Sequence, residues 1–378
     1  EEVRNARGTM TSLDVKGSRS LLKLAGGDMA LALGAEVRRE QSKSGGSELL
    51  LSDNILGDDT PGDSQTTGQS RKVWAVYGEI NAPLTKQLEL QLALRHDHYD
   101  NIGGTTNPKL GLRWTPTKEV LVRASAGTGF RAPSLNDMYR PTKTGATSIL
   151  PDPVYCAEND FDLGICAFPW ETRTYANPDL KPERSRQFSV GLVLQASDRL
   201  SFSVDYWNIT KRDLISTLGD DVILDNLAKY EPLVHRYSED EGLDGCDYDD
   251  TDNSICFIEL RKENRGRQKA SGLDMVVDLK PVATPFGRFG GRLNSTLALT
   301  SRQQTGYGDP YVSNLSRFVT NGVVQRWRHR LTLDWDSGPF ALSVSNSFLS
   351  SYEDQNSAID PDTGTYIAPN HVKAYSIW

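Results

Sequence analysis

The sequence predicts an all-β fold and, within that class, a transmembrane antiparallel β-barrel. Segments of about ten residues place apolar side chains at every second position, which is typical of strands with one apolar and one polar face. Very short turns alternate with long polar connections along the chain. No run of about 18 apolar residues is present, which excludes a transmembrane helix but not a barrel, whose strands show lipid only every second residue.

The segment 88–95 (LELQLALR) shows the alternation most clearly, with four leucines on one face and Glu, Gln and Arg on the other. The segments 200–206, 273–279 and 331–335 follow the same pattern. We expect about thirteen such strands between Thr11 and the last segment, 372–378. Aromatic residues near strand ends predict the two interfacial girdles of a barrel; they are Trp74, Trp114, Tyr206, Trp207, Trp327, Trp335 and Tyr352.

The connections between strands fall into two kinds. Short turns are expected at residues 26–28, 83–86, 116–118, 197–198, 285–287 and 337–339. Long connections are expected at about 41–71, 134–184, 216–265, 303–325 and 353–370. A soluble sandwich has no reason to keep every second loop long, whereas an outer-membrane barrel combines tight periplasmic turns with long external loops. We therefore interpret residues 1–378 as one barrel domain with these loops outside the cell.

The net charge and the two ends of the chain give further information about the class of protein. The chain is acidic, with a formal net charge of −8, which argues against nucleic acid as a partner because phosphate binding needs clustered Lys and Arg. The N-terminal residues lack a basic region followed by an apolar one, so no signal peptide is expected in this chain. An odd number of strands would leave two open edges in lipid, so the predicted barrel is incomplete at both ends.

The four cysteines form two pairs, Cys156 with Cys166 and Cys246 with Cys256, each with nine residues between. Zinc ligands are usually spaced two to four residues apart and have companion histidines, and these cysteine pairs show neither feature. Two loop-closing disulfides are the simplest interpretation and imply an oxidising, extracytoplasmic location, with unpaired thiols as the alternative. The acidic run at 239–252 around Cys246 is interpreted as a solvated loop, since its spacing does not fit a calcium loop.

Two motifs carry a resemblance to a known family. The segment 122–139 (VRASAGTGFRAPSLNDMY) closely resembles a signature of TonB-dependent outer-membrane receptors, and 177–185 (NPDLKPERS) is similar to a second signature of that family. The motif residues that match are Gly129, Phe130, Arg131, Ala132, Pro133, Asn177, Pro178, Leu180, Pro182 and Glu183. Proline removes a ladder donor where strand pairing ends, and Glu183 can pair with Arg131 or Arg184. We interpret these residues as the frame of a loop base that touches no ligand.

The resemblance implies an active importer in the bacterial outer membrane. Its family builds a barrel of twenty-two strands around an N-terminal plug that is absent from this chain, and the plug region contacts the TonB–ExbB–ExbD system. The implied partners are outer-membrane lipid and a small-molecule ligand bound by the external loops, and the implied state is a monomer without a cofactor. A ferric siderophore is the first ligand candidate by family analogy, with an oligosaccharide or cobalamin as alternatives. A passive porin or a structural barrel is the alternative function.

Candidate ligand contacts rest on residue type alone. Aromatic residues of the 134–184 loop can stack on an aromatic siderophore or sugar, or can form that loop's own core; they are Tyr155, Phe161, Phe168, Trp170 and Tyr175. No His lies between residues 134 and 176, which disfavours haem. His96 and His98 are interpreted as a lumen-facing or loop-base pair and not as a metal site. No catalytic motif is present, so no enzyme activity is expected.

Overall fold

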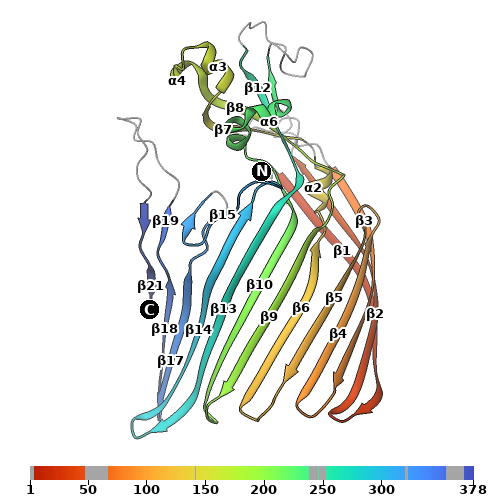
Figure 1. Cartoon of the computed structure of the whole chain (residues 1–378), viewed down its shortest axis with the longest axis vertical. Coiled ribbons are helices and arrows are strands. Elements are labelled where there is room, and N and C mark those ends of the chain that lie inside the picture. Colours follow the sequence, from red (N-terminus) through yellow and green to blue (C-terminus); the bar gives the residue numbers. More distant parts are fainter. Residues whose placement is uncertain are drawn as a thin grey trace.

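The computed structural model describes residues 4–46, 67–140, 142–237, 246, 253–319, 322–354 and 370–378. Most of this chain forms a single antiparallel sheet, and Figure 1 shows its strands tilted side by side with the loops gathered at one end. No helix in these ranges is long and apolar enough to span a membrane. The single antiparallel sheet confirms the predicted all-β class and the antiparallel sheet of a barrel.

The main sheet runs through thirteen strands of the described chain, the number that the alternation predicts, and its two edges are β1 and β21. Neighbouring strands are joined in chain order except where a long loop intervenes. In order, the strands are β1 (Arg4–Leu24), β2 (Gly27–Gly46), β3 (Thr67–Pro83), β4 (Leu88–Tyr99), β5 (Gly103–Trp114), β6 (Val120–Arg131), β9 (Glu183–Gln195), β10 (Leu200–Ser216), β13 (Glu263–Thr284), β14 (Gly287–Gln304), β17 (Trp327–Ser337), β18 (Phe340–Leu349) and β21 (Tyr375–Ile377).

Tight turns join the strands at one end of this sheet, at the six places that the sequence predicts. Several strands are longer than expected, because a barrel strand needs about 9–11 residues to cross a membrane and β13 has 22. β2 and β3 consequently extend into the predicted 41–71 loop, whose middle lies outside the described residues, as does 355–369. Short strands occupy the last loops, namely β15 (Val312–Ser313), β16 (Arg317–Phe318), β19 (Tyr352–Asp354) and β20 (Asn370–Val372).

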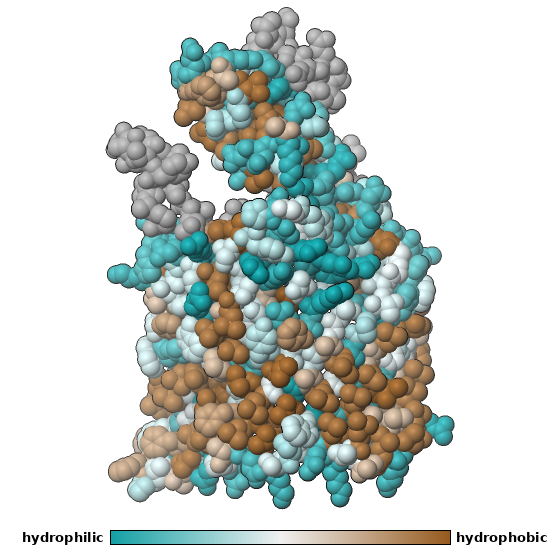
Figure 2. All heavy atoms as spheres, viewed as in Figure 1, coloured by the Kyte–Doolittle hydropathy of each residue, from teal (hydrophilic) through white to brown (hydrophobic). Residues whose placement is uncertain are grey.

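The sheet has an apolar outer face and a polar inner face. Leu92, Leu94, Val190 and Leu192 are among the exposed apolar side chains of the outer face. Figure 2 shows an apolar belt over the turn-end half of the strands. The hydrophilic surface lies above this belt, toward the loops (Figure 2). This separation is expected where alternate residues face lipid and lumen.

The predicted aromatic girdles are partly correct. Trp74 lies on the outer face in the middle of its strand, and Trp114 lies at the turn end of its own, each with nearly half of its surface exposed. Trp207 is wrongly assigned, because it follows Tyr206 directly and period-two alternation sends neighbours to opposite faces. Its ring instead covers Gly272, where a Cβ would lie 2.6 Å from the indole.

Two long loops together build a second sheet above the loop end of the barrel, which we call the cap (Figure 1). The 134–184 loop supplies β7 and β8, the 216–265 loop supplies β11 and β12, and the parallel pairing of β8 with β12 joins them. No local sequence pattern predicts this sheet. The cap elements are β7 (Lys143–Pro151), α3 (Pro153–Glu158), α4 (Leu163–Cys166), β8 (Ala167–Tyr175), α5 (Asp220–Asp225), α6 (Leu227–Tyr230), η1 (Glu231–Leu233), β11 (Val234–Arg236) and β12 (Ile255–Arg261).

Candidate functional site at the loop end of the barrel

The cap has its own hydrophobic core, drawn from both loops. Trp170 of β8 packs in it, and its indole N–H donates to the carbonyl of Leu150 at 2.8 Å. Ile223 of α5 and Ile258 of β12 are completely buried beside it. Because neither loop could bury these side chains alone, the two loops depend on each other for their structure.

A buried ion pair joins the same two loops. Asp152 of the first loop is fully buried and receives two hydrogen bonds from the Arg236 guanidinium of the second loop, at 2.8 and 2.9 Å. The Asp152 carboxylate also accepts from the backbone N–H groups of Val154 and Tyr155, so it caps α3 at its N-terminus. Arg236 Nη1 donates in addition to the carbonyl of Asn253. A bidentate pair of this kind fixes the orientation of both partners.

Both predicted disulfides are present and lie in the cap. Cys156 at the end of α3 is bonded to Cys166 of α4, with a Cα–Cα distance of 5.0 Å. Cys246 is bonded to Cys256 of β12, with a Cα–Cα distance of 5.7 Å. All four are buried. The rest of the acidic run at 239–252 lies outside the described residues, so its interpretation as a solvated loop stays a prediction.

The two family motifs meet where the cap leaves the barrel. Arg131 at the end of β6 forms an ion pair with Glu183 at the start of β9, with Nε 2.9 Å from Oε2. Arg131 is thus the partner among the two that the sequence proposes. Glu183 also accepts from the backbone N–H of Ile215 on β10 at 2.9 Å. This carboxylate therefore holds three successive strands together at the loop end of the wall.

A short helix, α2 (Leu135–Tyr139), continues from the first motif. The Ser134 side chain caps it by accepting a hydrogen bond from the N–H of Asp137. The Asp137 carboxylate accepts one from the Ser134 N–H, which completes a capping box. The Asp137 carbonyl accepts from the backbone N–H of Asn177 in the second motif at 3.0 Å. Asn177 in turn donates to the carbonyl of Lys262, directly after β12 of the cap. The second motif therefore connects α2 to the cap.

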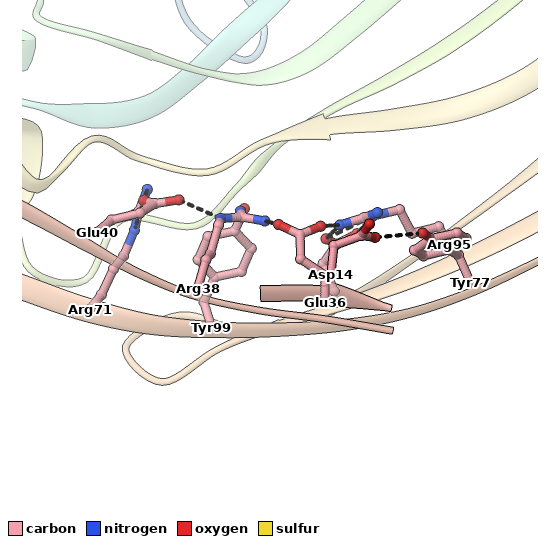
Figure 3. Close-up of polar contacts among 9 residues, drawn as sticks. Asp14, Glu36, Arg38, Glu40, Arg71, Tyr77, Arg95 and Tyr99 are labelled. Atoms are coloured by element: carbon pink, nitrogen blue, oxygen red, sulfur yellow. Dashed lines mark hydrogen bonds and ion pairs between the residues drawn. The ribbon is translucent and has the colours of Figure 1, made fainter. Parts of the chain in front are cut away.

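The inner face of β2, β3 and β4 carries a ladder of ion pairs beneath this base. Glu40 accepts from Arg38 and Arg71, each at 2.7 Å. Glu36 accepts from Arg38 at 2.9 Å and from Arg95 at 2.7 Å. Figure 3 shows these side chains pointing from their strands toward the side where the rest of the sheet lies. The ladder therefore lines the interior of the barrel wall.

The ladder reaches the first motif directly. Arg71 donates to the carbonyl of Pro133 at 2.6 Å, and both residues are buried. The ring of Tyr99 lies beneath the Arg71 and Arg38 guanidinium groups, whose Cζ atoms are 5.0 and 5.5 Å from its centroid (Figure 3). Arg38 also donates to the Tyr99 hydroxyl at 2.8 Å. Pro133 thus joins the loop base to the inner wall, a contact that proline's lack of an N–H does not hinder.

The five candidate aromatic residues do not form one cluster. Trp170 belongs to the cap core, and Phe168 contacts it edge to face at 5.6 Å while keeping 44% of its surface exposed. Phe161 is the most exposed of the five at 69%. Tyr175 lies near the cap base, with the Arg261 Cζ 5.9 Å from its ring, and Tyr155 is half-buried in α3. A role in ligand binding stays a prediction for all five.

The histidines of the barrel lie on the outer face and not in the lumen. His98 stacks on Trp74 with ring centroids 5.2 Å apart, and His96 lies 5.5 Å from the same indole. The lumen alternative for this pair is therefore wrong, because both residues share the parity of the apolar Leu92 and Leu94. Among the described residues, no group of three or more His, Cys, Asp or Glu could hold a metal ion.

Comparison with known proteins agrees with this architecture. The family model described as "TonB dependent receptor-like, beta-barrel" matches residues 4–378. The hemin receptor of Yersinia pestis is 27% identical over 179 residues, 43% of this chain and 24% of that protein. The ferric enterobactin receptor of Pseudomonas aeruginosa is 25% identical over 130 residues, 34% of this chain and 17% of that protein. The chain therefore spans a quarter or less of these relatives.

Solved structures share the fold over nearly the whole chain. The ferric enterobactin receptor PfeA in complex with BCV-L6 superimposes with a TM-score of 0.62 at 18% identity, covering 98% of this chain and 46% of that one. The siderophore receptor PirA of Acinetobacter baumannii gives a TM-score of 0.62 at 14% identity, covering 98% and 47%. At this identity the likeness concerns the fold alone. Together with the two joined motifs, the family match over residues 4–378 shows that the chain belongs to the β-barrel family of TonB-dependent outer-membrane receptors.

Proposed function

We propose that this chain forms the barrel wall and the cap of a receptor. The receptor binds a scarce ligand outside the cell and imports it with energy from the TonB system. The observation that carries the proposal is the cap: two loops share one core, one buried ion pair and two disulfides. A pre-ordered external surface binds a ligand at a smaller entropic cost than mobile loops do. We propose that the contact with TonB–ExbB–ExbD comes through the plug region that the family resemblance implies.

A ferric siderophore is the ligand class that we propose first. One sequence relative is named a ferric enterobactin receptor, and the structures that share the fold include siderophore receptors. Hemin is a weaker candidate, because residues 134–176 contain no His to ligate the iron, although one relative is named a hemin receptor. Cobalamin and oligosaccharides stay alternatives, the former because a relative in Photobacterium profundum is named a vitamin B12 transporter.

A passive porin is the competing function, and energy dependence separates the two. In the test, the full-length receptor is expressed in a Gram-negative bacterium that lacks its own iron receptors, in one strain with and one strain without the tonB gene. Uptake of ⁵⁵Fe-enterobactin, hemin, cobalamin and a maltodextrin is measured in each strain. We expect saturable uptake of the iron complex that disappears without TonB. Uptake that is equal in both strains would overturn the importer in favour of a pore.

Two aromatic side chains separate ligand contact from cap stability. Phe161 is exposed, so Phe161→Ala should leave the cap folded and raise the uptake KM if its ring stacks on the ligand. Trp170 is a core residue, so Trp170→Ala is expected to destabilise the cap by about 3–5 kcal/mol. An unchanged KM in Phe161→Ala, with cap proteolysis also unchanged, would remove Phe161 from the binding surface.

A further inference from the structure

A groove of about 1310 Å³ crosses the outer face of the barrel wall. Its walls are mostly apolar in the middle, where Leu92, Leu94, Leu110 and Phe188 line it, each at least 44% exposed. Its floor is lowered by small residues such as Ala126. None of the inner-face ion pairs described above lies in it, so it is separate from the proposed route of the ligand.

The groove follows a row of hydrogen-bonded partners across the sheet. Leu31 pairs with Ile80, Ile80 with Leu92, Leu92 with Leu110, and the row continues through Ala126 and Phe188 to Asn208. The strands are tilted (Figure 1), so the row runs obliquely. Leu31 lies near the turn end of β2, whereas Asn208 lies in the middle of β10. The groove therefore rises from the apolar belt toward the loops.

The upper end of the groove is strongly basic. Arg184 pairs in register with Arg212, and Arg212 with Arg267, while Arg186 pairs with Thr210 and Thr210 with Lys269. These five cations all line the groove. Along the part of the chain that is described, Arg184, Arg186, Arg267 and Lys269 have no carboxylate within ion-pair distance, and Arg212 has only Asp213 at 3.7 Å.

Two tyrosines of the 303–325 loop order the basic end. The Arg267 guanidinium lies over the ring of Tyr307 at 5.5 Å, and the Lys269 ammonium lies over that of Tyr311 at 4.8 Å. Tyr307 is itself held by a hydrogen bond from its hydroxyl to the Asp213 carboxylate. Burial and this hydrogen bond raise the pKa of Tyr307, which stays neutral beside the cations. The cations are thus presented together without being neutralised.

The height of the cluster matches a membrane interface. On the outer face of β9, the sequence runs through Leu194, Leu192, Val190 and Phe188 to Arg186 and Arg184. At ~3.3 Å per residue, the two arginines lie ~26 and ~33 Å along the strand from Leu194. A strand tilt of ~40° places them ~20–25 Å above it, which is the height of the apolar band of an outer-membrane barrel.

We propose that this groove binds an outer-leaflet lipid with a phosphorylated head group, its phosphates on the basic end and its acyl chains along the apolar part. The proposal rests on the outer-membrane location but not on the identity of the imported ligand. Charge complementarity selects the occupant, because five clustered cations at the interface attract phosphate, and Arg binds phosphate oxygens in a bidentate manner. A neutral lipid would leave these cations without a counter-charge.

The test measures binding of diphosphoryl lipid A to the purified full-length receptor in dodecyl maltoside by native mass spectrometry. The triple variant Arg184→Gln, Arg186→Gln and Arg267→Gln should bind roughly 100-fold more weakly, at about fivefold for each cation. Lys211→Gln is the matched control, since Lys211 neighbours Arg212 but lies on the inner face, and it should bind like the parent. Ala126→Phe fills the groove without changing charge and should also weaken binding. Heat-modifiable migration confirms that each variant is folded.

Three outcomes would overturn the proposal. Parent-like affinity in the folded triple variant would show that the cations are not the site. Equal affinity for dephosphorylated lipid A would reduce the groove to ordinary lipid contact. Tight binding of inorganic phosphate alone, unaffected by Ala126→Phe, would show that the acyl chains do not contribute to binding. Failure of TonB-dependent uptake would leave the lipid measurement unaffected, so the two proposals fail separately.

Discussion

Replacing Arg236 by alanine removes the cation from the ion pair that joins the two loops of the cap. The Asp152 carboxylate is completely buried, so water cannot replace the lost guanidinium. Removing one partner of a buried pair costs about 3–5 kcal/mol. The Val154 and Tyr155 N–H groups still donate to Asp152, so the lower value of ~3 kcal/mol is expected.

A loss of ~3 kcal/mol corresponds to roughly 100-fold more frequent opening of the cap, at 1.4 kcal/mol for each factor of ten. Hydrogen exchange with mass spectrometry measures this directly for amides of β8 and β12 in the full-length receptor. Protection there should fall by that factor in Arg236→Ala, while amides of β4 and β9 in the barrel should keep theirs.

Two further variants make the interpretation specific. Arg261 pairs with Glu259 at 2.8 Å in the same cap, but its side chain is half exposed, so Arg261→Ala should cost less than ~1 kcal/mol. The double variant Asp152→Asn with Arg236→Met removes both charges and should recover most of the protection. A change below about threefold in Arg236→Ala, or an equal loss in the barrel strands, would refute the reasoning.

Two other predictions concern the disulfides and a close approach in the wall. Replacing Cys156 and Cys166 by serine should destabilise the cap by ~3 kcal/mol, as expected for a short closed loop, with faster proteolysis of the cap and unchanged heat-modifiable migration of the barrel as the readout. Gly191→Val should lower the urea midpoint of the barrel in detergent, since a Cβ there would lie 1.9 Å from the Asp205 carboxylate, which Arg123 holds in place with two hydrogen bonds at 2.7 and 2.6 Å. Gly8→Ala is its control, because nothing lies within 4 Å of that Cβ; equal midpoints for the two variants would contradict the prediction.

The barrel wall could be predicted from sequence because its rules are local. Alternation in segments such as 88–95 fixes which side chains face outward, and turn length fixes which end carries the loops. The same rule corrects Trp207, since only one residue of the adjacent pair Tyr206 and Trp207 can face lipid. Glu183 was predictable as an ion-pair partner because the first motif ends one strand and the second begins its neighbour. Alternation also favours Arg131 over Arg184, because the adjacent residues Glu183 and Arg184 face opposite sides of the strand.

The cap could not be predicted in this way. β8 and β12 pair in parallel, with Ile258 opposite Thr172, and no local pattern sets a register between segments so far apart in the chain. β12 begins with four buried residues in succession and therefore shows no alternation. Asp152 and Arg236 carry no local sequence signal of their pairing, because their burial follows from the assembly of the two loops. The pattern within one loop carries no information about the other, so the sequence leaves the loop aromatic residues open between core and ligand.

Hydrogen bonds at the loop base connect the cap to the barrel wall. Asn177 bonds to Lys262 below the cap and to Asp137 of α2, and the carbonyl of Pro133, just before α2, accepts from Arg71 of the inner wall. Each contact is a hydrogen bond to a backbone group, so it fixes chain position more than side-chain identity. These bonds form one continuous path of contacts from the cap through α2 to Arg71 of the inner-face ladder. The same path passes through both motifs and, with the Arg131–Glu183 ion pair, explains why they lie together at the loop base.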